Sequence, residues 1–366
     1  MDEAVESGGP IWYNCPICGS VGLPPSFEKK KGKVPSVRGT AEKMKINLKT
    51  VLAALMLAAG CATAPDGAIK VASYNIRLSG SNGRADYGTP NAWKERKEDL
   101  LSLIRKLDLD VFGLQEVCPD QAQFLRDNLA GYEFVGEHRN ADRITGEASP
   151  VCYRKSRFEA LGKGTFWLSQ TPDTPGLKGW GAACPRVCSY LILRDRSTGK
   201  KFCFANVHTD HVSALARKNG MLLVIDRMKE FGAGLPIVFT GDHNCRETEE
   251  PAKAVATHLK DALYISETPQ KGSWRTFSGW KWQERELSIV EALRVPAEVR
   301  NAKEGSPDAM KDAQGRHPCE KYGARIDYIY VSGGIRVLEF ETVNDPRPGK
   351  TLYPSDHFPV VATIEL

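Results

Sequence analysis

The feature that most constrains the fold is an alternation between short β-rich runs and longer stretches with helical periodicity. In Asn91–Leu107, apolar residues recur on one helical face with charges between them. Ile69–Ile76 and Pro236–Thr240 are short apolar runs typical of buried strands. No linker, repeat or low-complexity tract interrupts residues 68–366, so we expect one α/β domain over residues 65–366.

Further strands and helices are expected along the same stretch. The turn sequence Arg196–Gly199 separates two strand-like runs and predicts a hairpin. A charged insertion between Trp282 and Cys319 has room for one or two helices. The remaining predicted strands are 110–115, 151–154, 158–161, 165–168, 189–194, 201–207, 325–331, 335–342 and 358–365, and the remaining predicted helices are 119–129 and 212–231.

The N-terminal region has the pattern of an export signal. A lysine-containing segment precedes the apolar run Val51–Ala59, which is too short to span a bilayer. The run leads into Leu57–Cys61, which resembles a bacterial lipobox and would make Cys61 a lipidated N-terminus. Ala62–Ala64 would suit ordinary cleavage instead, and a short core helix is the plain alternative. We expect a signal peptide at residues 44–64 and an exported protein: a periplasmic or cell-surface lipoprotein attached to the membrane through Cys61, or else a secreted protein.

Residues 1–43 precede this signal, although an export signal normally starts a chain. Because Met44 begins a well-formed signal by itself, we expect the extension to be untranslated or disordered. The pair Cys15 and Cys18 is half of a zinc-site pattern, and no second pair follows at suitable spacing. Seven cysteines follow Cys61, so at least one would stay unpaired. Cys152 and Cys203 lie in apolar runs and are expected to be buried thiols.

The charge balance does not identify a partner. The chain has 50 Lys and Arg residues against 45 Asp and Glu residues. Binding to a polyanion usually needs a local basic stripe, and a total this close to neutral neither shows nor excludes one.

Polar residues stand directly at the ends of the predicted strands. Singly, each has an ordinary explanation, because Asp and Asn after a strand often only make turn or cap hydrogen bonds. Together they indicate a site, because the strands of one sheet system bring their ends to a common edge. The residues are Asn75, Glu116, His208, Asp242, Asn244, Asp327, Asp356 and His357.

This set of side chains suits phosphoester hydrolysis, which needs a cation, an activated water and donors for the developing charge. Glu116 and Asp356 offer hard oxygen ligands, and Asn75 offers an amide oxygen. Oxygen ligands favour Mg²⁺, Mn²⁺ or Ca²⁺ over Zn²⁺.

The remaining roles follow from the same chemistry. An imidazole titrates near neutral pH, so His357 can act as a base. Asp327 would fix the tautomer of His357, while His208 and Asn244 would donate to the phosphoryl oxygens.

Six ordered motifs resemble the endonuclease/exonuclease/phosphatase superfamily of DNase-I-like hydrolases, in an exported bacterial form. The resemblance implies a four-layer α-β-β-α sandwich of two packed, mostly antiparallel sheets, with the site at one edge. The motifs are Tyr74-Asn75-Ile76-Arg77, Leu114-Gln115-Glu116-Val117, Asn206-Val207-His208, Gly241-Asp242-His243-Asn244, Arg325-Ile326-Asp327-Tyr328 and Ser355-Asp356-His357-Phe358-Pro359.

The resemblance also implies roles for the matched residues. Glu116 would hold the metal, with Asn75 and Asp356 close by. His357 would pair with Asp327, and Asp242 would orient or deprotonate the attacking water. Asn244 would position the phosphate, and His208 would stabilise the transition state. Whether Asp242 or His357 is the general base stays open.

Four positions carry less specific expectations. Arg77 resembles a phosphate-contacting position, and a surface salt bridge is the alternative. Asp210 follows His208 in a variant typical of small exported members and is a candidate substrate-binding residue. Phe277 lies in an aromatic loop, Trp274–Trp280, and either contacts substrate or packs. His243 replaces an apolar residue and is expected to be exposed, with a substrate contact as the alternative.

The sequence therefore predicts a metal-dependent hydrolase of a phosphate monoester or diester. Nucleic acid, a lipid headgroup and a phosphorylated small molecule all stay open as substrates, and no protein partner is evident. A catalytically inactive, surface-anchored binding module on the same fold is the alternative from another class. The complete set of metal, dyad and phosphate-binding residues argues against it.

Overall fold

The computed structural model describes residues 67–80, 83–280, 325–350 and 352–366, which belong to one compact unit. The extension at residues 1–43, the signal peptide expected at residues 44–64 and the charged insertion between Trp282 and Cys319 lie outside the described residues. Within the described part, no helix is both long enough and apolar enough to cross a membrane.

Seven strands form the first sheet, in the order β10-β12-β13-β1-β2-β4-β3. The pairs β1 with β2 and β10 with β12 are parallel, and the other neighbours are antiparallel. The strands are β1 (Ile69–Asn75), β2 (Val111–Gln115), β3 (Tyr132–Val135), β4 (Val151–Arg154), β10 (Lys271–Gly272), β12 (Arg336–Thr342) and β13 (Val360–Glu365).

Six strands form the second sheet, in the order β5-β6-β7-β8-β11-β9. Only β7 and β8 run parallel, and the antiparallel pairing of β6 with β7 confirms the predicted hairpin. The strands are β5 (Phe158–Trp167), β6 (Val187–Asp195), β7 (Lys201–His208), β8 (Ile237–Asp242), β9 (Lys260–Asp261) and β11 (Asp327–Val331).

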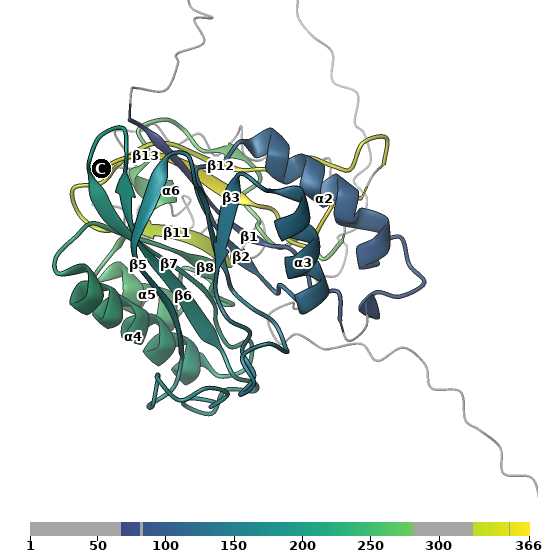
Figure 1. Ribbon diagram of the computed structural model, residues 1–366, viewed down its shortest axis with the longest axis horizontal. Coiled ribbons are helices and arrows are strands. Elements are labelled where there is room, and N and C mark those ends of the chain that lie inside the picture. Colours follow the sequence, from purple (N-terminus) through teal and green to yellow (C-terminus); the bar gives the residue numbers. More distant parts are fainter. Residues whose placement is uncertain (1–66, 81–82, 281–324, 351) are drawn as a thin grey trace, which may run out of the picture. The chain divides into compact units, whose positions relative to one another are not determined.

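Helices cover the outer face of each sheet (Figure 1). Helices α2 (Trp93–Leu107) and α3 (Pro119–Asn128) bury their apolar faces against β1 and β2. Helices α4 (Ala214–Gly232) and α5 (Glu250–Ala256) pack on β7, β8 and β11. The inner faces of the two sheets bury a third cluster between them, beside the short helix α6 (Ala262–Ile265). These layers confirm the predicted four-layer α-β-β-α sandwich.

Most predicted elements are present, with a few differences. The strands expected at 158–161 and 165–168 are one strand, β5, whose pairing with β6 shifts register between Ala160 and Gly162. The sequence did not predict β3, β9, β10, α5 and α6, which are short and show little apolar periodicity. All six described cysteines are free, and the expected burial of Cys152 and Cys203 is confirmed.

A buried polar network joins the two sheets beneath the site. Gln115 donates from Nε2 to Ser73 Oγ at 3.0 Å and to Asn206 Oδ1 at 2.7 Å. Asn206 in turn donates to the carbonyl oxygen of Leu114 at 2.8 Å. Position 113 must be glycine, because a Cβ there would lie 2.2 Å from Asn206 Oδ1. Since every polar atom taking part in these bonds is paired, the network holds the ends of β2 and β7 in one arrangement.

Candidate active site

The polar residues at the strand ends meet at one edge of the sandwich, as their sequence positions predict. Asn75 ends β1, and Glu116 directly follows β2, its parallel neighbour. In the second sheet, Asp242 ends β8 and lies in register with both His208 of β7 and Asp327 of β11. The two sheets therefore supply one site.

Asp242 is the centre of this site. Its Oδ2 accepts a hydrogen bond from Asn75 Nδ2 at 2.9 Å, and its Oδ1 accepts one from the backbone N–H of Asn244 at 2.9 Å. Its Oδ2 also lies 3.5 Å from His208 Nε2 and 3.7 Å from His357 Nε2. Burial and the carboxylate of Asp327 raise the pKa of Asp242 to about 7. A carboxyl group with such a pKa can exchange a proton near neutral pH.

The predicted dyad is formed. His357 Nδ1 lies 2.9 Å from Asp327 Oδ2, which fixes the ring and directs Nε2 toward Asp242. The half-buried ring of Phe277 packs edge-on against His357 with centroids 4.9 Å apart. Phe277 thus reaches the site and packs against the dyad; a substrate contact by Phe277 stays a prediction. Burial alone would lower the pKa of His357, but Asp327 and Asp242 outweigh it and raise that pKa to about 10.

We predict that the imidazole of His357 titrates near pH 10 in protein without added metal, far above its ordinary value of about 6.5. Because the folded-state pKa is raised, the pairing stabilises the fold fully below about pH 6.5. That contribution is lost as the pH rises toward 10. Histidine NMR titration of ¹⁵N-labelled protein measures the pKa directly.

The variant Asp327→Asn supplies the comparison, because it keeps the shape and removes the charge. We expect the pKa of His357 to fall in this variant, and the stability lost between pH 6.5 and 10 to shrink with it. A wild-type His357 that titrates near 6.5 would contradict the paired geometry.

Two carboxylates converge beside the dyad. Glu116 accepts hydrogen bonds from Asn75 Nδ2 at 3.0 Å and from the N–H of Leu78 at 2.9 Å. The guanidinium of Arg77 lies 3.9 Å from Glu116 and 3.8 Å from Asp356, and it also pairs with Asp86 at 3.2 Å. Arg77 therefore forms the ion pairs that were the alternative for it, and its contact with phosphate stays a prediction.

Asn75 differs in detail from its expected role. Its Oδ1 accepts the backbone N–H of Arg77 at 2.9 Å, while its Nδ2 donates to Glu116 and Asp242. These bonds make Asn75 a positioning residue that links the metal-site carboxylate to the central aspartate. Its expected role as an oxygen ligand stays a prediction.

Three of the site residues have left-handed backbone conformations. The φ angles are 56° at Arg77, 61° at Glu116 and 47° at Asn244. A residue with a Cβ is sterically strained in this conformation, and such strained residues cluster at functional sites. Each follows a strand end, so the sharp change of direction turns the side chain back into the site.

The two phosphate-binding candidates contact each other. Asn244 Nδ2 lies 2.9 Å from His208 Nε2. Burial, together with Arg186 and Arg139, holds the pKa of His208 well below its usual range. Because an amide nitrogen only donates, Nε2 of the neutral ring accepts from Asn244, and the N–H of the ring lies at Nδ1, 3.9 Å from Glu147.

Sequence reasoning missed Glu147, which lies between β3 and β4. Its Oε2 is 3.9 Å from His208 Nδ1, and its Oε1 pairs with Arg139 Nη2 at 2.8 Å. Arg186 Nη1 lies 3.9 Å from the same carboxylate. No apolar strand end marks Glu147 or Arg139 in the sequence, so the pattern that revealed the other residues did not apply to them.

Asp210 is buried and organises a loop. Its carboxylate accepts backbone N–H groups from Ala183, Val212 and Ser213 at 2.8–3.0 Å. Arg186 lies 4.0 Å away. These contacts give Asp210 a structural function, and its direct contact with substrate stays a prediction.

The expectation that His243 is exposed was wrong. The side chain is completely buried and packs among the rings of Phe239, Tyr328 and Tyr330, with centroids 4.9–5.5 Å apart. Burial lowers its pKa to about 3, so the ring is neutral. His243 points away from the site because neighbouring side chains of a strand-like segment alternate in direction.

Comparison with known proteins identifies the family. The model of the endonuclease/exonuclease/phosphatase family matches residues 72–357. The chain belongs to this family. Its members that resemble this chain are hydrolases of phosphoester bonds, and the chain is an enzyme of that class.

Several relatives show the range of the family. The structure of a mannosyl-6-phosphatase from Bacteroides thetaiotaomicron is 29% identical with a TM-score of 0.66, covering 81% of this chain and 100% of that one. Nocturnin from Drosophila melanogaster is 26% identical over 302 residues, 75% of this chain and 42% of that protein. The Ccr4 exoribonuclease subunit of Phaeosphaeria nodorum is 28% identical over 159 residues, 37% of this chain. The chain thus spans 26% of the Ccr4 subunit and less than half of Nocturnin.

Proposed function

We propose that the protein is a divalent-metal-dependent phosphomonoesterase that releases inorganic phosphate from a phosphorylated sugar. The observation that carries this proposal is the similarity to a mannosyl-6-phosphatase over the whole length of that chain. The Nocturnin and Ccr4 relatives are 26% and 28% identical over the matched residues, and this chain matches only part of each.

The proposed metal fits the residues around Glu116. Glu116 and Asp356 both lie within 4 Å of the guanidinium of Arg77, so the two carboxylates face one common region of the site. Carboxylate oxygens are the ligands that Mg²⁺ and Mn²⁺ prefer. We therefore assign Glu116 and Asp356 as the residues that would hold the ion. When bound, it would neutralise charge on the phosphoryl oxygens.

The side chains around Asp242 would activate the attacking water. Asp242 would take its proton, because a pKa of about 7 leaves this carboxyl group partly ionised near neutral pH. His357, with its pKa raised to about 10, already carries a proton there and would hold it 3.7 Å from Asp242 Oδ2. We assign Asn244 and His208, whose Nδ2 and Nε2 lie 2.9 Å apart, as the residues that would contact the phosphoryl oxygens. In this assignment Asp242 activates the water, while Asn244 and His208 contact the phosphoryl group.

A substrate panel tests the proposal. Mannose 6-phosphate, bis-p-nitrophenyl phosphate, single-stranded RNA and single-stranded DNA would be compared with Mg²⁺ or Mn²⁺, using protein that begins at Ala62. We expect phosphate release from the sugar phosphate to have the highest kcat/KM, and EDTA to abolish it. His357→Ala is the control for a contaminating phosphatase.

The alternative outcomes are distinct. Preferential cleavage of RNA or DNA would replace the sugar phosphatase with a nuclease at the same site. Turnover of no substrate by well-folded protein would favour an inactive binding module. Export and lipid attachment at Cys61 are a separate proposal, tested by mass spectrometry of the mature N-terminus.

A further inference from the structure

We infer that a hollow beside Glu116 holds the leaving group of the substrate, and that this leaving group is an uncharged polyhydroxyl compound such as a sugar. The inference rests on the proposed function and extends it to the residues that select the substrate. The hollow has a volume of about 760 Å³ and lies between the loop after β1 and the loop joining β3 to β4.

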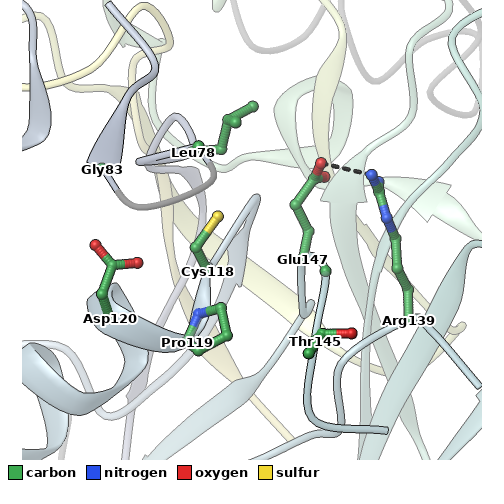
Figure 2. A pocket seen from close by; sticks show the side chains of 10 residues that line it. Leu78, Gly83, Cys118, Pro119, Asp120, Arg139, Thr145 and Glu147 are labelled. Carbon is green, nitrogen blue, oxygen red and sulfur yellow. Dashed lines mark ion pairs between the residues drawn. The ribbon is translucent and has the colours of Figure 1, made fainter. Parts of the chain in front are cut away.

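Polar side chains from separate elements face this hollow (Figure 2). Asp120, at the start of α3, lies on one side, and the ion pair of Arg139 with Glu147 lies on the other. Leu78 and Pro119 contribute apolar surface. A mixed lining of carboxylates, a guanidinium and aliphatic groups suits a ring with both C–H faces and hydroxyl groups.

The hollow adjoins the catalytic side chains on one flank only. Leu78, which lines it, donates its N–H to Glu116, and Glu147, which also lines it, is 3.9 Å from His208. His208 in turn is 3.5 Å from Asp242, and Asp242 is 3.7 Å from His357. The hollow is thus connected to Asp242 and His357 through Glu147 and His208, and neither Asp242 nor His357 lines it.

The lining of the hollow fits the leaving group rather than the attacking water, because the hollow includes neither Asp242 nor His357. In an in-line displacement the attacking water and the leaving oxygen lie on opposite sides of the phosphorus. Water that gives a proton to Asp242 would form the new bond to phosphorus. The bond from phosphorus to the leaving oxygen would break on the side of Glu147 and the hollow, and the leaving oxygen would take a proton from solvent there.

The charge of the lining argues against an anionic leaving group. Asp120 and Glu147 supply two carboxylates, whereas Arg139 supplies one guanidinium that Glu147 already holds at 2.8 Å. A nucleotide or nucleic-acid chain would bring further phosphates against this net negative surface. A neutral sugar would instead donate its hydroxyl groups to the carboxylates.

The shape of the lining also disfavours a nucleobase. Among the described residues that line the hollow, none has an aromatic side chain. Proteins that hold unpaired bases typically stack them on aromatic rings. The lining therefore points to a sugar rather than a base.

Asp120 is the residue that tests this inference most cleanly. It is exposed, and its Oδ1 accepts the hydroxyl group of Ser79 at 2.6 Å. Asp120→Asn keeps an oxygen for Ser79 and removes the charge, while Asp120→Ala removes both. We expect kcat/KM for mannose 6-phosphate to fall about ten- to hundredfold more than kcat/KM for p-nitrophenyl phosphate, mainly through KM.

The matched control is Asp127→Asn, which removes an exposed carboxylate from the same helix away from the hollow. It should leave both substrates within twofold of wild type. As a second measurement, free mannose should inhibit hydrolysis of p-nitrophenyl phosphate competitively, and Asp120→Asn should weaken that inhibition at least tenfold.

The outcomes separate the inference from the function on which it rests. Equal losses on both substrates, or no loss in either Asp120 variant, would overturn the sugar-binding hollow while leaving the phosphatase intact. A wild-type enzyme that cleaves bis-p-nitrophenyl phosphate but no hexose phosphate would instead overturn the proposed function, and the inference with it.

Discussion

Replacing Asp242 with asparagine should lower kcat by about 10²–10⁴-fold with little change in stability. Asp242 accepts hydrogen bonds from Asn75 and Asn244, and it is the only described carboxylate that lies within 4 Å of both His208 and His357. Asparagine keeps the size of the side chain but supplies neither a negative charge nor a proton acceptor of comparable basicity.

The measurement is single-turnover phosphate release, so that product release does not mask a change in chemistry. Asp226→Asn on the exposed face of α4 is the matched control and should retain wild-type rates. Thermal unfolding of both variants separates a loss of catalysis from a loss of structure. Activity of Asp242→Asn within tenfold of wild type would remove Asp242 from the centre of the mechanism.

Replacing Arg325 with alanine should lower the free energy of unfolding by about 3–5 kcal/mol. Arg325 is completely buried and pairs with Glu247 at 2.7 Å and with Asp261, which are themselves buried. Its guanidinium also lies over the ring of Tyr328, 4.3 Å from the centroid. Without Arg325, two carboxylates are left in the interior without their counter-charge. Such a loss is a large fraction of the stability of a typical domain.

Denaturant unfolding followed by far-UV circular dichroism measures this effect. The control is Arg336→Ala, because Arg336 also pairs with two carboxylates, Glu267 and Glu365, but on the surface with its side chain 58% exposed. Solvent screens those pairs, so the control should lose far less stability than Arg325→Ala. Equal losses of unfolding free energy in the two variants would show that burial of the Arg325 ion pairs does not increase their contribution to stability.

The Arg325 cluster also connects stability to the site. Arg325 stands two residues before Asp327, and β11 begins at Asp327. By holding the chain just before this strand, the ion pairs fix the point from which Asp327 reaches His357. We therefore expect Arg325→Ala to reduce activity as well, at temperatures where the variant is still folded.

The strand-end residues were predictable from the sequence because their chemistry is local. Glu116 and Asp242 directly follow or end short apolar runs, and parallel strands such as β1 and β2 place their carboxyl ends together. The apolar face of helices such as α2 and the short apolar strands predicted one α/β domain, while the order of its layers was implied by the resemblance of the six motifs to the family. These features depend on neighbours in sequence, which a pattern can detect.

The misassigned residues depend on partners far apart in the chain. His243 is buried by Tyr328 and Tyr330, which come from a strand more than 80 positions later, so nothing beside it in sequence indicated a core position. Glu147 belongs to the site only because its loop folds over His208. The orientation of the Asn75 amide is likewise set by hydrogen bonds to Glu116 and Asp242 from other strands.

The central claim is metal-dependent hydrolysis of a phosphoester at the edge formed by the two sheets. The most direct test is a Mg²⁺ titration of phosphate release from mannose 6-phosphate by wild type and Glu116→Gln, with Glu98→Gln on the surface of α2 as the control. We predict that wild type and Glu98→Gln gain activity with Mg²⁺ and lose it with EDTA, and that Glu116→Gln needs far more Mg²⁺ or stays inactive. Equal Mg²⁺ dependence in all three proteins, or full activity in EDTA, would contradict the account.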